Sequence, residues 1–121
     1  MPSFIVIVLV LVLTSLCTGT RAGRAWALTY YHTVRIALRS RGLESDEKAR
    51  IFNEEARKWA DRLQMVFDYE VEVDGELPGG PLLLLCNHQS ALDIPVLLAS
   101  IPADKACSFM PKLEMKKVAL P

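Results

Sequence analysis

Asn87 and His88 stand directly behind a run of four leucines, and an acid, Asp93, follows the histidine by five residues. Histidine and carboxylate side chains are the groups that proteins most often use to move protons near neutral pH. If Asp93 accepts a hydrogen bond from one ring nitrogen of His88, it fixes the tautomer and leaves the other nitrogen free as a general base. On a continuous helix, residues five apart diverge by about 140°. The pair can therefore meet only where a turn leads into a helix.

A second interpretation of the same residues needs no catalysis. Ser90 or Asp93 caps the following helix, and His88 is incidental. Spacing alone does not decide between the cap and the catalytic pair, and Asn87 and Ser90 can support the turn in either case through side-chain to backbone hydrogen bonds. No serine or cysteine nucleophile motif accompanies the histidine, and no second ligand set indicates a metal. If His88 is catalytic, the reaction step that these residues favour is direct deprotonation of a substrate hydroxyl.

Strands and a helix are expected to position this pair. The run PLLLLC at 81–86 is short and continuously apolar, which is typical of a central strand covered on both faces. Apolar residues alternate with acids in DYEVEVDGEL at 68–77, which predicts a half-exposed strand. A helix should begin at residues 91–93 and end at Ser100, with Pro95 in its first turn, because a proline deeper inside would break a backbone hydrogen bond. Strand, turn and helix together predict an α/β fold.

An amphipathic helix is predicted over residues 21–41. Its basic face, at about 100° per residue, holds Arg21, Arg24, His32, Arg35 and Arg39. Its opposite face holds Trp26, Tyr30, Val34 and Ala37. This division favours a helix lying in a membrane interface, with rings at headgroup level and arginines at lipid phosphates. The alternative is a helix packed on the domain with a solvated basic face. His32 has no acidic neighbour at helical spacing, so we expect no catalytic role for it.

A second helix is predicted from Ser45 onward. Its apolar stripe faces the core at Phe52, Ala56, Trp59, Leu63 and Val66. The charges of the opposite face are interpreted as a solvated surface; they are Glu54, Glu55, Arg57, Lys58, Asp61 and Arg62.

The chain opens with an apolar segment. Counted from Pro2 to Thr20, the uncharged run approaches the roughly 17–25 residues that span a bilayer. Arginines follow the run, so the positive-inside tendency places the remainder of the chain on the cytoplasmic side. The alternative is a cleaved signal peptide, which would require lysine or arginine before the run. We therefore expect a retained transmembrane anchor in the cytoplasmic (inner) membrane.

Composition argues against nucleic-acid binding and against a framework built on cysteines. The 14 basic and 14 acidic residues balance, so no general attraction to nucleic acid is expected. The three cysteines, Cys17, Cys86 and Cys107, lack motif spacing. This argues against a disulfide framework or a zinc site and suits a reducing compartment.

The turn and its surroundings resemble a known family. NHQSALD at 87–93 matches the Asn-His-four-residues-Asp signature of the glycerolipid acyltransferases, and IPVLLASIP at 94–102 is similar to its usual continuation. FMPKLEM at 109–115 is similar to a segment that the family often writes as Phe-Val-Ala-Lys-Lys-Glu-Leu. In particular, the sequence resembles the bacterial 1-acyl-glycerol-3-phosphate acyltransferases, which make phosphatidic acid. The resemblance covers about residues 68–121.

The resemblance implies roles for particular residues. His88 would remove the proton from the free sn-2 hydroxyl of lysophosphatidic acid, and Asp93 would orient His88. That hydroxyl would attack the thioester of an acyl-CoA or acyl carrier protein directly, with no further cofactor. Lys112 aligns with a lysine that helps to hold the substrate phosphate, whereas Leu113 departs from a frequent second lysine.

The resemblance also implies a division of the chain. Residues 1–20 would be the anchor, 21–66 interfacial and packing helices, and 67–121 the N-terminal part of an α/β catalytic domain. We expect this domain to be incomplete at its C-terminal end, since the family's later motifs would follow residue 121. Three alternatives remain open: an inactive anchored fragment or interaction module, an acyltransferase for another lysolipid or glycerol-3-phosphate, and a small secreted domain.

Overall fold

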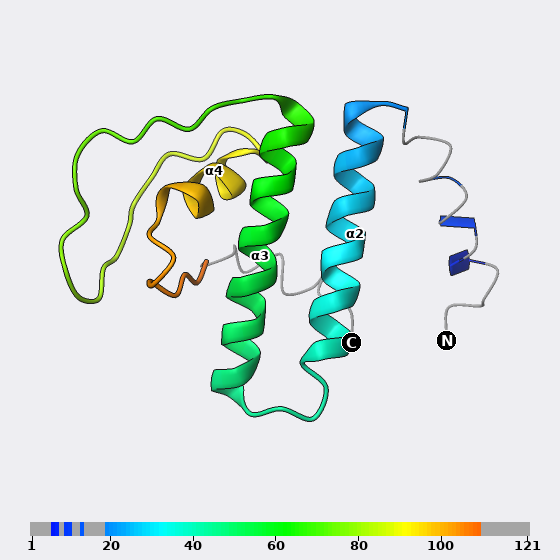
Figure 1. The fold of residues 1–121 in the computed structure, drawn as a ribbon, viewed down its shortest axis with the longest axis horizontal. Coiled ribbons are helices and arrows are strands. Elements are labelled where there is room, and N and C mark those ends of the chain that lie inside the picture. The colour runs from blue at the N-terminus through cyan, green and yellow to red at the C-terminus, as the bar shows by residue number, and fades with distance from the viewer. Residues whose placement is uncertain (1–5, 8, 11–12, 14–18, 110–121) are drawn as a thin grey trace.

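The computed structural model describes residues 6, 7, 9, 10, 13 and 19–109, and three helices lie within residues 19–109. They are α2 (Arg21–Arg39), α3 (Ser45–Phe67) and α4 (Asp93–Ser100). Helices α2 and α3 form an antiparallel hairpin, and α4 packs on the side of α3 away from α2 (Figure 1). The segment between α3 and α4 makes a long excursion without regular structure before it returns to α4 (Figure 1).

Local signals set the ends of the hairpin. The Thr20 hydroxyl accepts a hydrogen bond from the amide of Gly23 at 3.0 Å, which caps α2. Gly42, in the connection to α3, has φ +70°, a left-handed conformation that glycine adopts without a steric penalty. Asp68 ends α3 in the same conformation at φ 56°, and its amide donates to the carbonyl of Gln64.

A small apolar core joins α3 to α4. Ala56, Ala60 and Leu98 are buried together, and four partly buried side chains pack against them: Trp59, Ile94, Cys107 and Phe109. The predicted core stripe of the second helix is therefore confirmed at Ala56, Trp59 and Leu63, whereas Phe52 is partly exposed. The Trp59 indole also donates to the hydroxyl of Thr29 at 2.9 Å, which ties α3 to α2.

The predicted α/β fold is wrong for the described residues. Neither 68–77 nor 81–86 forms a strand, and no other strand occurs between residues 19 and 109. A strand is stable only beside a partner that takes up its N–H and C=O groups. With no such partner in this part of the chain, Leu83 and Leu85 are 80% and 89% exposed. An apolar run can thus favour a strand locally without producing one.

The predicted transmembrane anchor is not supported either. No helix in the described part of the chain is both long and apolar enough to cross a bilayer. Most of residues 1–20, where the anchor was expected, lies outside the described residues.

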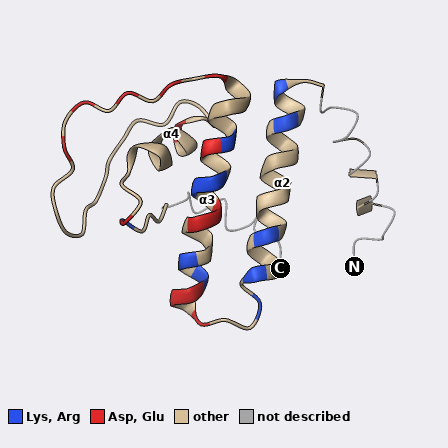
Figure 2. Ribbon diagram, in the orientation of Figure 1, with Lys and Arg blue, Asp and Glu red and all other residues tan. Residues whose placement is uncertain are grey.

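The basic face of α2 points in an unexpected direction. Figure 2 shows positive charge at both ends of α2, beside the mixed charges of α3. His32, Arg35 and Arg39 all contact Glu55 of α3, so this part of the basic face is paired with an acid of the neighbouring helix, although both arginines remain partly exposed. It is the apolar face that is turned outward: Trp26 is 71% exposed, and Tyr30 is exposed as well. The division into two faces agrees with the sequence prediction, and the outward aromatic face agrees with the interfacial interpretation, whereas the contacts of the basic face with Glu55 were not predicted.

Glu55 was expected on a solvated surface, and it is completely buried. Burial favours its neutral form, but hydrogen bonds from Arg35, His32 and Arg39 outweigh burial and lower the pKa of Glu55 from 4.5 to about 2. The shortest of these contacts joins Arg39 Nη1 to Glu55 Oε1 at 2.6 Å. Glu55 therefore stays ionised in the interior, because cations from the neighbouring helix surround it.

Candidate active site

The turn at residues 88–93 brings the predicted pair together. Asp93 is the first residue of α4, and its side chain reaches back over the turn. Its Oδ2 atom lies 3.1 Å from Nδ1 of His88. The same oxygen accepts hydrogen bonds from the amides of Gln89 at 2.7 Å and Ser90 at 2.8 Å. One carboxylate oxygen of Asp93 thus makes all three of these contacts across the turn.

Ser90 supports the turn as the sequence predicts. Its hydroxyl accepts a hydrogen bond from the amide of Leu92 at 3.1 Å, and its carbonyl accepts one from the amide of Asp93 at 3.1 Å. Asn87, the other predicted support, is exposed and makes no hydrogen bond to any of residues 19–109. The turn is therefore held by Ser90 and Asp93, and the predicted support from Asn87 is not seen.

Hydrogen bonding keeps Asp93 ionised. The amides of Ser90 and Gln89 lower the pKa of Asp93 below its ordinary 3.8, and the contact with His88 acts in the same direction. An ionised carboxylate has no proton to donate, so Nδ1 of His88 must carry the hydrogen of this contact. The cap and the catalytic pair, which spacing alone left as alternatives, are compatible, because Asp93 does both.

The side chain of His88 is largely exposed. With Nδ1 protonated in the neutral ring, Nε2 carries the lone pair and can accept a proton. The His88 side chain is 62% exposed and that of Asp93 33% exposed. A hydroxyl group placed about 3 Å from Nε2 would meet the geometric requirement for general-base catalysis. The arrangement can therefore abstract a proton from a substrate that approaches the open side of the turn.

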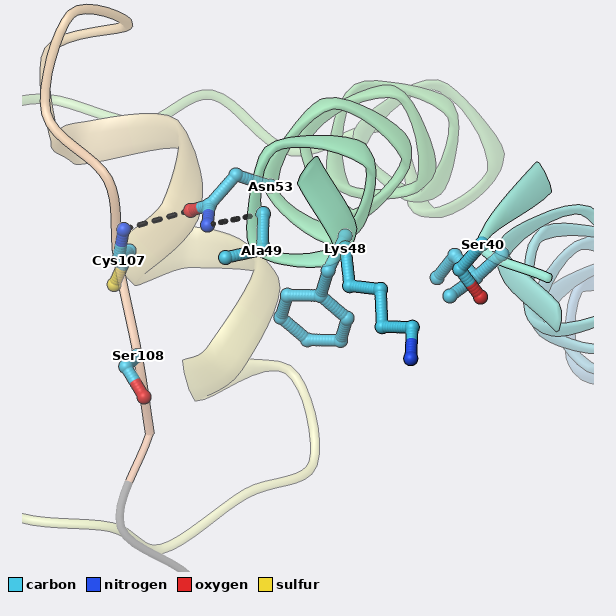
Figure 3. Close-up of a pocket in the computed structure, with 8 residues that line it drawn as sticks. Ser40, Lys48, Ala49, Asn53, Cys107 and Ser108 are labelled. Carbon is cyan, nitrogen blue, oxygen red and sulfur yellow. Dashed lines mark hydrogen bonds between the residues drawn. The ribbon is translucent and has the colours of Figure 1, made fainter. Parts of the chain in front are cut away.

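Other predicted or possible ligands lie elsewhere. Lys112, the predicted phosphate ligand, falls outside the described residues. Among the residues that the structure describes, no group of three or more His, Cys, Asp or Glu side chains could hold a metal ion. A hollow of about 330 Å³ lies between α2, α3 and residues 107–108, with Ser40 and Lys48 among its lining residues (Figure 3). Neither His88 nor Asp93 lines it.

Comparison with known proteins supports part of the resemblance. The chain is 40% identical over 60 residues to "Lyso-ornithine lipid O-acyltransferase" of Pseudomonas aeruginosa. The matched stretch is 50% of this chain and 22% of the relative, so the chain spans about a fifth of that protein's length. No protein-family model matches the chain, and no solved structure matches it. A lipid acyltransferase is thus a relative, while a specific relation to the 1-acyl-glycerol-3-phosphate enzymes is not supported.

Proposed function

We propose that this chain carries the proton-transfer pair of an acyltransferase that acylates the hydroxyl of a lysolipid. The observation that carries the proposal is the contact between His88 Nδ1 and Asp93 Oδ2 at 3.1 Å, in a histidine side chain that is 62% exposed. The similarity to a lipid acyltransferase supports the reaction class. His88 acts as the general base, and Asp93 holds its ring in the required tautomer.

The reaction needs no covalent enzyme intermediate. The substrate hydroxyl loses its proton to Nε2 of His88 as its oxygen attacks the thioester carbonyl of acyl-CoA or an acylated carrier protein. The new C–O ester bond forms, the C–S bond breaks, and the proton passes from His88 to the departing thiolate. The positive charge that develops on His88 lies beside the ionised Asp93, which stabilises it.

Two acceptors fit the proposal. The sequence motifs favour lysophosphatidic acid, whose acylation gives phosphatidic acid, with Lys112 holding the phosphate. The relative's name instead favours a lyso-ornithine lipid. Both acceptors offer a free hydroxyl to the same base, so the choice between them does not alter the proposed roles of His88 and Asp93.

A lipid surface is the proposed place of action. Trp26, Tyr30 and Val34 lie exposed along one face of α2, and aromatic rings favour the headgroup region of a bilayer. The proposed location is the cytoplasmic side of the inner membrane, reached by surface contact. Flotation with lipid vesicles tests it: a Trp26→Ser, Tyr30→Ser variant should stay with the soluble fraction, whereas the unaltered protein floats.

The deciding assay offers each acceptor and each donor to the purified protein and measures ester formation. We expect product with one acceptor, and His88→Ala should abolish acyl transfer while vesicle binding persists. Asp74→Asn, which alters an exposed acid elsewhere in the connection between α3 and α4, is the matched control and should keep full activity. Near-normal turnover by His88→Ala would remove His88 from the role of base.

A further inference from the structure

Arg57 of α3 binds the end of the helix that carries Asp93. Its Nη1 donates to the carbonyls of Leu98 at 3.1 Å and Ile101 at 2.7 Å. Its Nη2 donates to the carbonyls of Pro102 at 2.9 Å and Lys105 at 2.7 Å. One side chain therefore holds four backbone oxygens at and beyond the C-terminal end of α4.

Helix chemistry explains why an arginine occupies this place. The last carbonyls of a helix have no partner within the helix, and they form the negative end of its dipole. Arginine offers several donors in a rigid plane and keeps its charge, so it can serve several of these oxygens together. A lysine ammonium is a compact point charge and cannot span the same set. Arg57 was predicted to lie on a solvated surface. Its partners are more than 40 positions away, so no local pattern in the sequence indicates them.

A second side chain of α3 reinforces this attachment. Asn53, one turn before Arg57, accepts a hydrogen bond from the amide of Cys107 at 2.6 Å. Its own amide donates to the carbonyl of Ala49 at 2.9 Å, which fixes its orientation (Figure 3). The strip of chain that follows α4 is thus held against α3 by two adjacent polar side chains.

Apolar packing alone would not fix α4 in the same way. Pro95 and Leu98 are buried, and Leu98 packs against Ala56 and Ala60. Such contacts are not directional. They determine which face of α4 packs against α3, but they determine the position of α4 along its own axis less strictly. The four hydrogen bonds of Arg57 are directional and act at one end of a helix about 12 Å long. Asp93 lies at the other end.

We propose that Arg57 is a positioning residue for the His88–Asp93 pair, holding α4 so that Asp93 keeps its bonds across the turn. The effect on catalysis rests on the proposed acyltransferase function, whereas the effect on the turn does not. Arg57 lies at the far end of α4 and touches neither side chain of the pair, so it acts only through the helix.

The test compares Arg57→Gln and Arg57→Lys with the unaltered full chain, and Arg50→Gln, an exposed arginine of the same helix, is the matched control. In Arg57→Gln, amide hydrogen exchange at Gln89 and Ser90 should accelerate roughly tenfold, and the pKa of Asp93 should rise toward 3.8. The kcat of acyl transfer should fall by roughly 10–100-fold with little change in KM, because misplacement by an ångström weakens catalysis to that extent. Arg57→Lys should give intermediate values, and Arg50→Gln should change none of them.

The outcomes separate the two proposals. Unchanged exchange at Gln89 and Ser90, with an unchanged titration of Asp93, would overturn the positioning role whatever the activity. If the unaltered protein forms no ester with any acceptor, the proposed function fails, and the exchange and titration data still decide the role of Arg57. Should Arg57→Gln not fold, the intermediate values expected for Arg57→Lys become the test. Exchange that accelerates equally throughout α2 and α3 would show a purely structural role and would also overturn the proposal.

Discussion

The chain contains two histidines, and each lies within hydrogen-bond distance of a carboxylate. His32 Nδ1 lies 2.9 Å from Glu55 between α2 and α3, and His88 Nδ1 lies 3.1 Å from Asp93 at the start of α4. The first pair is buried and the second is open to solvent. The two pairs share their chemistry and differ in every other respect.

The remaining partners of each acid explain the difference. Glu55 is held by Arg35 and Arg39 from the neighbouring helix, so this pair exists only when the hairpin is formed. Asp93 is held by amides three and four positions before it, so this pair forms within a single turn. The second ring nitrogen of His32 is buried without a partner among the described residues, whereas that of His88 belongs to a largely exposed ring. Only the exposed pair can receive a substrate.

The largest expected effect is a difference in activity between variants of Asp93 and variants of Glu55. We expect Asp93→Asn to lower kcat about 10²–10⁴-fold, because an amide no longer fixes the tautomer of His88 or stabilises its charge. Glu55→Gln should leave kcat per folded molecule within about twofold, since its histidine meets no substrate. The measurement is steady-state acyl transfer, corrected for the folded fraction by circular dichroism. Equal losses in the two variants would erase the functional difference between the pairs.

The free energy of unfolding should be affected more by Glu55→Gln than by Asp93→Asn, the reverse of the order expected for activity. Glu55→Gln leaves one buried histidine and two arginines without their anion, which in a fully buried pair costs roughly 3–5 kcal/mol. Both arginines are partly exposed and can be rehydrated, so we expect a loss of about 2 kcal/mol in the free energy of unfolding. Asp93→Asn should change the free energy of unfolding much less, because its contacts are local and exposed. Urea denaturation followed at the helical circular dichroism band provides both values. A larger loss in Asp93→Asn would contradict the assignment of Glu55 as the structural acid.

The pH dependence of stability should belong to the buried pair. The folded-state pKa of Glu55, about 2, lies below its ordinary value of 4.5. Its contribution is therefore complete above about pH 5 and is lost as the pH falls toward 2. Thermal melting between pH 2 and pH 6 should show this decline, and Glu55→Gln should flatten it.

Glu54 provides the control for this titration. Hydrogen bonds from Lys58 and Arg39 also lower its pKa to about 2, but solvent screens this acid because its side chain is exposed. Glu54→Gln should therefore retain most of the decline between pH 5 and pH 2. If the decline in thermal stability disappeared in Glu54→Gln and persisted in Glu55→Gln, the pH dependence would have to be assigned to the exposed Glu54 instead of the buried Glu55.

The comparison also explains what the sequence could predict. The contact of His88 with Asp93 is local, so residue types and spacing offered it as one of two interpretations, and the resemblance to the acyltransferases favoured it. The start of α4 and the place of Pro95 were predicted from local signals. The contact of His32 with Glu55 joins residues 23 apart, and nothing at helical spacing indicates it. The same limit applies to Arg57, whose partners lie more than 40 positions away in the sequence. It also applies to the strand expected at 81–86, because strand pairing depends on residues remote in the sequence.

The smallest expected effect tests how local the exposed pair is. Ser90→Ala removes the acceptor for the Leu92 amide, a single exposed hydrogen bond worth about 0.5 kcal/mol. Amide exchange at Leu92 should therefore rise severalfold, and kcat should fall only a few-fold, because Asp93 still accepts hydrogen bonds from the amides of Gln89 and Ser90. Exchange within α2 and α3 should not change, and Ser45→Ala, at the start of α3, should leave Leu92 unaffected. If Ser90→Ala instead lowered the stability of the whole hairpin, the turn would be coupled to the buried pair, and the two histidine–carboxylate contacts would have to be treated as one unit.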